Sequence, residues 1–337
     1  MRSGWVEVRD SAQHAPGGVL RDVESGEVVQ PELELCPGFR RPAVFSDSDE
    51  VWGGALPRLV RFFCSSLAPG AFRRYRWEEA PGGVAVPVEW SPCGIGELEE
   101  ALGVLAAPET VGEFGVPLCE CITGEVPRRA IERRAIPEER RQRERAVATG
   151  CFRRRTAGLT GFRVEYRLAF CDFVEAKWNF FPGGDVELRL RFWFSGTRRP
   201  IHIMTGFGFP AAGFGGFAYY SQATRVRVPD DIIPGGCGEG IGVNNGVELD
   251  YADGRLVVAS PDTPIAMFGG IHSRDGNKFH PGDRVEPQLW FSILNSFWNT
   301  NFAHAERDEL ECRFVFSRLA ASPDEAAGEL WSYPVRV

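Results

Sequence analysis

The segment Asp185–Phe194 reads D-V-E-L-R-L-R-F-W-F and decides the fold class of this chain. Apolar side chains occupy every second position, and charged side chains stand between most of them. The apolar positions are Val186, Leu188, Leu190, Phe192 and Phe194. Alternation with a period of two over this length predicts a β-strand with one buried face and one wetted face.

The same alternation recurs on both sides of this segment. It is found over Phe162–Phe170 and again over Leu310–Phe316. Between them, two alternating runs flank Ala252-Asp253-Gly254, which predicts a hairpin over Val247–Val258. A long series of such strands predicts an all-β protein whose antiparallel sheets stack with their polar faces outward.

The 337 residues are too many for one small core, and the strand signals divide them into parts. Residues 1–85 carry short strands and turn signals, which predict a small β-sandwich. Residues 151–337 carry the long strands and are expected to form a large antiparallel β-sandwich. Residues 86–150 are expected to connect the two with a few strands and an Arg/Glu-rich excursion.

Helical signal is confined to the connecting residues. Ile95–Ala106 could form one short helix, although its glycines weaken that prediction. Val126–Thr149 is rich in arginine and glutamate and has too few apolar residues to bury a face. We interpret it as a solvated helix or a mobile surface excursion rather than a basic interaction arm, because its glutamates dilute the positive charge.

Composition and charge exclude several classes of partner. The net charge of −8 argues against nucleic acid, since binding phosphates requires a basic surface. No apolar run is long enough for a membrane span. The first residues alternate like a strand, so no signal peptide is visible and a cytoplasmic location is expected.

The nine cysteines do not form a recognisable metal or disulfide pattern. The closest pair, Cys119 and Cys121, is a C-x-C, and the sequence contains no second pair at matching spacing. A structural zinc site would require such a second pair. We therefore expect free thiols in a reducing cytoplasm and no metal site.

The segment Gln288–Phe302 reads Q-L-W-F-S-I-L-N-S-F-W-N-T-N-F and is the most specific in the chain. It opens as a buried strand and ends in a cluster of Asn295, Trp298, Asn299 and Asn301 around Thr300. An indole beside several amides suits a sugar site, because a pyranose can stack on the ring while its hydroxyls pair with the amides. The alternative is a polar loop in which the asparagines cap backbone groups and the indole fills the core.

A resemblance to a known family favours the sugar site. The string N-S-F-W-N-T-N-F at Asn295–Phe302 resembles the N-N-x-W-x-T-N-F/Y signature in the C-terminal β region of family 38 glycoside hydrolases, of the α-mannosidase type. Ser296 departs from the second asparagine of that signature. Shorter stretches resemble the same family in the same order, namely G-V-L at 18–20, L-A-P-G-A-F-R at 67–73, I-P-G-G-C at 233–237 and A-S-P-D-T-P at 259–264.

The resemblance implies a large sandwich of the galactose-mutarotase-like kind that packs against a catalytic barrel. In that family an N-terminal α/β barrel holds a zinc ion, a carboxylate nucleophile and an acid/base carboxylate. This chain has no alternating βα pattern that would build a barrel. Its five histidines are scattered and none stands in an H-x-D pair. We therefore expect no catalytic residue and no cofactor here, with zinc belonging only to a missing barrel.

Other polar or glycine-rich segments are explained by local structure rather than by a functional site. The loop I-H-S-R-D-G-N-K-F-H-P-G-D at 271–283 could suggest a metal site, but its turn formers favour a solvated hairpin tip. The carboxylates of Asp230 and Asp231, and those of Asp172 and Glu175, would face opposite sides of regular strands and could not act together. The glycine-rich aromatic run Gly206–Tyr220 has no following helix for a phosphate cradle, although its aromatics could floor a saccharide cleft.

The sequence therefore predicts a carbohydrate-associated domain that forms one wall of a sugar cleft beside a catalytic barrel. The expected substrate-binding residues are Asn295, Trp298, Asn299, Thr300 and Asn301, with His272 and Arg274 as weaker candidates. Two alternatives stay open. One is a stand-alone carbohydrate-binding protein, and the other is a mutarotase-like sugar epimerase, which would need a histidine and a carboxylate facing each other.

Overall fold

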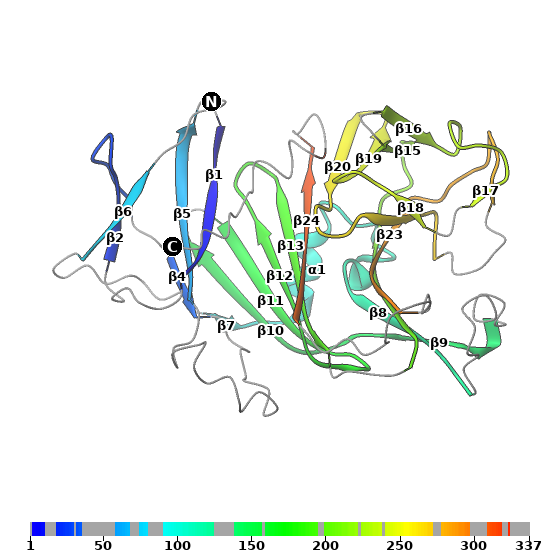
Figure 1. The fold of residues 1–337 in the computed structure, drawn as a ribbon, viewed down its shortest axis with the longest axis horizontal. Helices are drawn as coiled ribbons and strands as arrows, with labels where there is room; N and C mark the ends of the chain where they lie inside the picture. The colour runs from blue at the N-terminus through cyan, green and yellow to red at the C-terminus, as the bar shows by residue number, and fades with distance from the viewer. Residues whose placement is uncertain are drawn as a thin grey trace. The chain divides into compact units, whose positions relative to one another are not determined.

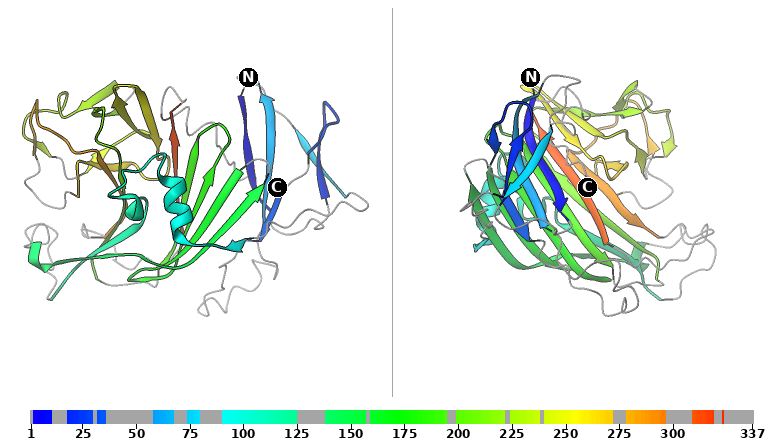
Figure 2. Two further views of the ribbon diagram at one scale, coloured as in Figure 1. Left: turned by 180° about the vertical axis from the view of Figure 1, so that it is seen from behind. Right: turned by 60° about the vertical axis from the view of Figure 1, so that its left-hand side comes forward.

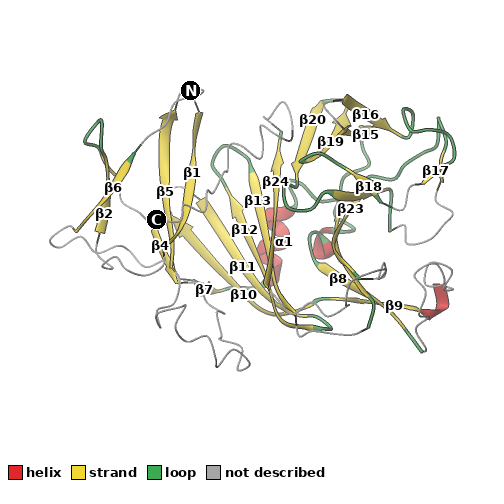
Figure 3. Cartoon of the chain, in the orientation of Figure 1, coloured by secondary structure: helices red, strands yellow, loops and turns green. Residues whose placement is uncertain are grey.

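The computed structural model describes residues 2–10, 18–29, 32–35, 58–67, 74–79, 90–124, 138–156, 159–194, 199–221, 224–237, 240–271, 278–296, 309–318 and 323. The chain divides into two compact units. Unit 1 comprises Met1–Trp90 with Gly328–Val337, and unit 2 comprises Ser91–Ala327. Strands dominate both units (Figures 1 and 3), which confirms the prediction of an all-β protein.

The described strands of unit 1 form two three-stranded antiparallel sheets. In the first, β5 (Arg58–Leu67) is central between β1 (Arg2–Asp10) and β4 (Glu32–Leu35). In the second, β2 (Gly18–Asp22) is central between β3 (Val28–Val29) and β6 (Tyr75–Glu79).

Unit 2 is built on a ten-stranded antiparallel sheet. Its strands follow the order β16 (Thr224–Val228), β15 (Phe214–Ser221), β19 (Gly246–Tyr251), β20 (Gly254–Ala259), β24 (Glu309–Ser317), β13 (Val186–Phe194), β12 (Cys171–Phe180), β11 (Leu159–Arg167), β10 (Val147–Thr156) and β7 (Ser91–Pro92). The hairpin predicted around Ala252-Asp253-Gly254 is confirmed as β19 and β20. The long strands β10 to β13 lie side by side in the views of Figure 2.

A six-stranded antiparallel sheet forms the second layer of unit 2. Its order is β18 (Ile241–Gly242), β21 (Ile265–Phe268), β23 (Gln288–Asn295), β14 (Ile201–Gly208), β8 (Pro117–Ile122) and β9 (Arg141–Arg145). A short pair, β17 (Gly236–Cys237) and β22 (Lys278–Phe279), stands apart from both large sheets. The helical elements with described bounds are α1 (Ile95–Leu102), η1 (Val111–Glu113) and η2 (Glu138–Arg140).

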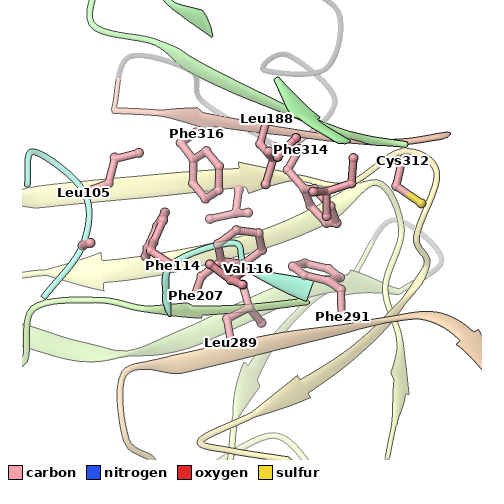
Figure 4. Packing of buried hydrophobic residues seen from close by; sticks show 14 of the residues in the cluster. Leu105, Phe114, Val116, Leu188, Phe207, Leu289, Phe291, Cys312, Phe314 and Phe316 are labelled. Atoms are coloured by element: carbon pink, nitrogen blue, oxygen red, sulfur yellow. The ribbon is translucent and has the colours of Figure 1, made fainter. Parts of the chain in front are cut away.

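One connected hydrophobic core lies between the two large sheets. Phe207 of β14 reaches Phe314 and Phe316 of β24, with ring centroids 5.3 Å and 5.1 Å away. Figure 4 shows these rings facing one another, with Phe114 and Phe291 beside them. The apolar side chains that alternate over Asp185–Phe194 therefore form the core face of β13. As predicted, this face is buried between two stacked sheets.

Two expectations about the connecting residues need revision. The helix predicted over Ile95–Ala106 exists but ends at Leu102. Within Val126–Thr149, the described residues form a 3₁₀ turn followed by strands β9 and β10, so the helix alternative is wrong for residues 138–149, although most of these residues are exposed. The charged residues alternate across the β9 edge strand, and this pattern is typical of a strand as well as of a solvated segment.

The aromatic run Gly206–Tyr220 also differs from one expectation. Phe207, Phe209 and Phe217 are each 1% exposed and pack in the main core, so they cannot floor a saccharide cleft. Asp230 and Asp231 lie in a turn after β16, where Asp231 accepts a hydrogen bond from the backbone N–H of Arg227 at 2.9 Å. The pair is therefore part of a turn rather than of a regular strand.

Candidate functional site

The six-stranded sheet has a core face and an outer face, because its side chains alternate along each strand. Residues on the core face that join the main core include Cys119, Ile203, Phe207, Leu289 and Phe291. We define the outer face by the residues between them: Leu118, Glu120, Arg141, Arg143, Arg145, His202, Met204, Gly206, Trp290, Ser292 and Asn295. This face gathers a histidine, a carboxylate, three arginines and an indole on one surface.

A row of polar residues crosses the outer face from strand to strand. Asn295, His202, Glu120 and Arg143 lie opposite one another on β23, β14, β8 and β9. The row depends on an irregularity in the pairing of β14 with β23 at Ile203/Met204. Without this bulge, the residue opposite His202 would be Leu294, so the extra residue brings an amide rather than an isobutyl group into the row.

Glu120 is the charged centre of this row. Its side chain is fully buried, and its two oxygens accept from Arg141 Nη1 at 2.8 Å and from Arg143 Nε at 2.7 Å. The Arg141 side chain is 4% exposed, whereas that of Arg143 is 31% exposed. Both carboxylate oxygens are therefore engaged, and Glu120 positions two arginines rather than offering an open base.

His202 lies next to Glu120 and is also buried. Its Nε2 shares a hydrogen bond of 2.8 Å with the hydroxyl of Ser292 on the neighbouring strand. Burial, with smaller contributions from the positive charges of Arg141 and Arg143, lowers the pKa of His202 to about 3. The imidazole is therefore neutral at physiological pH and acts as a polar but uncharged group in the row.

This low pKa of His202 predicts a specific loss of stability in mild acid. Between about pH 7 and about pH 5, the unfolded histidine takes up a proton near its ordinary pKa, whereas the folded one stays neutral. The unfolded state binds more protons in this window, so the free energy of unfolding should fall by about 2 kcal/mol more in the wild type than in His202→Gln. Urea unfolding at several pH values measures this difference, and parallel curves for the two proteins would contradict it.

Trp290 supplies an aromatic platform on the same face. The indole lies on Gly206, where an added Cβ would stand 2.7 Å from Cδ2, Cε2 and Cε3 of the ring. Glycine is therefore required beneath it. The Arg145 guanidinium is 5.9 Å from the ring centroid and also pairs with Glu113, with Nη2 and Oε2 separated by 2.8 Å. The indole stays half-buried, packed against Leu118, Met204 and Met267.

The structure describes one of the seven residues expected to bind substrate. Asn295 ends β23, is exposed and belongs to the polar row with His202. Trp298, Asn299, Thr300 and Asn301 lie outside the described residues, as do His272 and Arg274. The part of the motif that is described therefore continues a strand of the outer face.

Several residues of this face were missed by reasoning from sequence. Trp290 could have been found, because it alternates with the core residues Leu289 and Phe291 in the same motif. The pattern Arg141-x-Arg143-x-Arg145 also marked a strand. No local signal linked these arginines to Glu120, which is about 20 residues earlier and on a neighbouring strand.

A second polar cluster lies on the face of the ten-stranded sheet opposite the core. Asn179 and Arg189 both donate to Glu187 at 2.8 Å, and Lys177 lies 3.5 Å from Glu175. These contacts link neighbouring side chains along and across β12 and β13, as in a structural ladder. Asp172, which the sequence grouped with Glu175, is exposed, whereas Glu175 is buried.

Within the described ranges, no three His, Cys, Asp or Glu side chains gather in a way that could hold a metal ion. The expectation that this chain needs no metal therefore stays a prediction. The helices of those ranges are also too short or too polar to cross a membrane. In comparisons with known proteins, no family model matches the chain and no curated protein matches it.

Proposed function

We propose that this chain is a carbohydrate-associated β-sandwich protein whose outer face contributes to a saccharide-binding site. In the form favoured by its resemblance to family 38 glycoside hydrolases, it supplies one wall of a sugar cleft and a separate barrel supplies the zinc and the chemistry. Its partners would then be a carbohydrate and a catalytic barrel, rather than nucleic acid or a membrane.

One observation carries the proposal, namely the half-buried indole of Trp290 on the same sheet face as the polar row. A flat apolar ring can stack on the C–H face of a pyranose. Amide and guanidinium groups on the same face can pair with the hydroxyls of a saccharide. Asn295 and the partly exposed arginines Arg143 and Arg145 reach solvent on this face, so they are the groups that would meet a ligand first.

The two alternatives make different demands on the same face. A stand-alone carbohydrate-binding protein would need the same platform without a barrel. A sugar epimerase is supported by His202 and Glu120, which lie directly opposite each other on β14 and β8. However, both oxygens of Glu120 are held by arginines, which leaves the carboxylate poorly placed to move a proton to or from a sugar.

The proposal predicts that Trp290→Ala weakens saccharide binding at least about tenfold, because buried aromatic anchors carry much of the binding energy at such sites. Saturation-transfer NMR and calorimetry with methyl α-mannoside and a series of mannose oligosaccharides would measure the affinity. Trp290→Phe keeps a ring on Gly206 and should retain most of it. The chain alone is expected not to hydrolyse an aryl mannoside.

Trp193 offers a matched control, since it is also half-buried but lies on β13 of the other sheet. Trp193→Ala should leave the affinity unchanged. Equal loss in both variants, or binding unaffected by Trp290→Ala, would remove the outer face from the proposal. Hydrolysis of an aryl mannoside that depended on a residue of this chain would overturn the assignment of chemistry to a separate barrel.

A cytoplasmic location belongs to the same proposal. Six cysteines within the described ranges are free thiols, namely Cys93, Cys119, Cys121, Cys151, Cys171 and Cys312. Free thiols suit a reducing compartment, where disulfides rarely persist. Fractionation of the native host would test this location directly.

A further inference from the structure

Two of the free thiols lie in contact at the start of unit 2. The Sγ atoms of Cys93 and Cys151 are 3.5 Å apart, although 58 residues separate them in sequence. Cys93 follows β7, and Cys151 lies within β10. A disulfide bond requires a separation of about 2.0 Å, so a displacement of about 1.5 Å would join them.

The backbone already holds the two residues in register. Pro92 pairs with Phe152 and Ser91 with Arg153, so Cys93 and Cys151 are the next opposed positions of the same antiparallel ladder. The N–H of Cys93 donates to the carbonyl of Cys151 at 3.0 Å. Directly opposed residues have Cα atoms about 4.5–5.5 Å apart, within the range that a disulfide spans.

An ion pair fixes the same junction from the other side. Arg153 of β10, two residues after Cys151, pairs with Glu97 in the first turn of α1, four residues after Cys93. The thiols are thus held between a strand pairing and an ion pair, and neither contact has to break for the sulfurs to approach. Both cysteines are half-buried, while Pro92 and Gly94 on either side of Cys93 are exposed, so a small oxidant can reach this position.

We propose that Cys93 and Cys151 form a redox-responsive disulfide that fastens the edge strand β7 to β10. The oxidant belongs to the class of small disulfides, such as oxidised glutathione. One cysteine thiolate attacks the small disulfide, forms a mixed disulfide and releases one glutathione thiolate. The second cysteine then attacks the mixed disulfide and releases the other, so the protein loses two electrons and two protons while one disulfide becomes two thiols.

The environment of the two thiols indicates the order of these steps. Burial and the adjacent Cys93 raise the pKa of Cys151 to about 12, which makes Cys151 a poor nucleophile near neutral pH. Cys93, which is flanked by the exposed residues Pro92 and Gly94, is the more accessible of the two, so it is expected to attack first and Cys151 to close the intramolecular bond. Under this order Cys151→Ser should trap glutathione on Cys93 as a stable mixed disulfide.

The test is peptide mapping of the full chain after incubation with oxidised glutathione and alkylation of remaining thiols. Cleavage after arginine and glutamate puts Cys93 in residues 90–97 and Cys151 in residues 146–153, each without another cysteine. We expect these two peptides joined, with a mass about 2 Da below their sum. The joined species should persist in the control Cys121→Ser and disappear in both Cys93→Ser and Cys151→Ser.

A second readout follows from the closed loop. A bond across 58 residues restricts the unfolded chain and should raise the melting temperature of the oxidised protein by roughly 5–10 °C. Glutathionylated Cys93 and Cys151 without the joined peptide would overturn the proposal. Disulfides that join Cys93 or Cys151 to other cysteines to the same extent would also count against the proposal. So would an oxidised protein whose melting temperature is no higher than that of the reduced protein.

Discussion

Phe207→Ala is expected to lower the free energy of unfolding by about 3–5 kcal/mol, the usual cost of removing a buried phenylalanine. Phe207 is 1% exposed and stands in the middle of the core between the two large sheets. Its ring lies 5.1 Å from Phe114 and 5.1 Å from Phe316, measured between centroids. Phe114 directly follows η1, and Phe316 lies in β24 of the opposite sheet, so the cavity left by alanine cannot close without moving one sheet toward the other. Urea denaturation followed by circular dichroism would measure the loss.

Two further variants separate the causes of this effect. Phe207→Leu keeps most of the volume but removes the edge-to-face ring contacts, so it should cost a smaller amount, about 1–2 kcal/mol. Ile233→Ala changes an apolar residue that is 80% exposed and should have almost no effect. A Phe207→Ala protein as stable as Ile233→Ala would show that this ring does not join the two layers.

The fold class could be predicted from the sequence because alternation is a local signal. The residues of Asp185–Phe194 carry their burial pattern in their own order, and β13 buries Leu188, Leu190 and Phe192 completely. The hairpin at Ala252-Asp253-Gly254 was equally accessible, since turn residues and flanking strands are neighbours in the chain. Strand patterns and turns that are encoded within a short stretch of residues could therefore be predicted from the sequence.

The order of strands within the sheets was not predictable in this way. β14 lies between β8 and β23, which are far from it in sequence, and β24 lies between β13 and β20. These pairings depend on many long-range contacts that no single segment encodes. The candidate site depends on the same order, because Glu120, His202 and Asn295 come from three strands that meet only in the folded sheet.

The bulge at Ile203/Met204 is a further feature that could not be predicted from the sequence. It decides that Asn295 rather than Leu294 lies opposite His202. A shift of one residue exchanges the two faces of a strand, so the polar row could not be read from the pattern of β23 alone. The sequence predicted Asn295 as a site residue from its amide side chain and its place in a family signature. Its neighbours in space are known only from the pairing of β14 with β23.

Glu120→Gln is expected to destabilise the protein by about 3–5 kcal/mol, because it removes the fully buried negative charge that Arg141 and Arg143 both contact. Arg141 is 4% exposed at its side chain and pairs with Glu120 at 2.8 Å. Glutamine has nearly the same size as glutamate, so packing is kept and the loss reports the charge. Chemical denaturation of the wild type and the variant at the same pH would measure the difference.

Glu113→Gln is the matched control, since Glu113 pairs with Arg145 at the same distance but is 58% exposed. An exposed pair contributes about 0–1 kcal/mol, so the stability of this variant should remain close to that of the wild type.

The double variant Glu120→Leu with Arg141→Leu removes both buried charges and should regain much of the lost stability. The reason is that the desolvation cost of a buried ion pair nearly equals the attraction between its charges. If Glu120→Gln were as mild as Glu113→Gln, Glu120 would not be the residue that holds the arginines on the outer face, and the polar row would lose its charged centre.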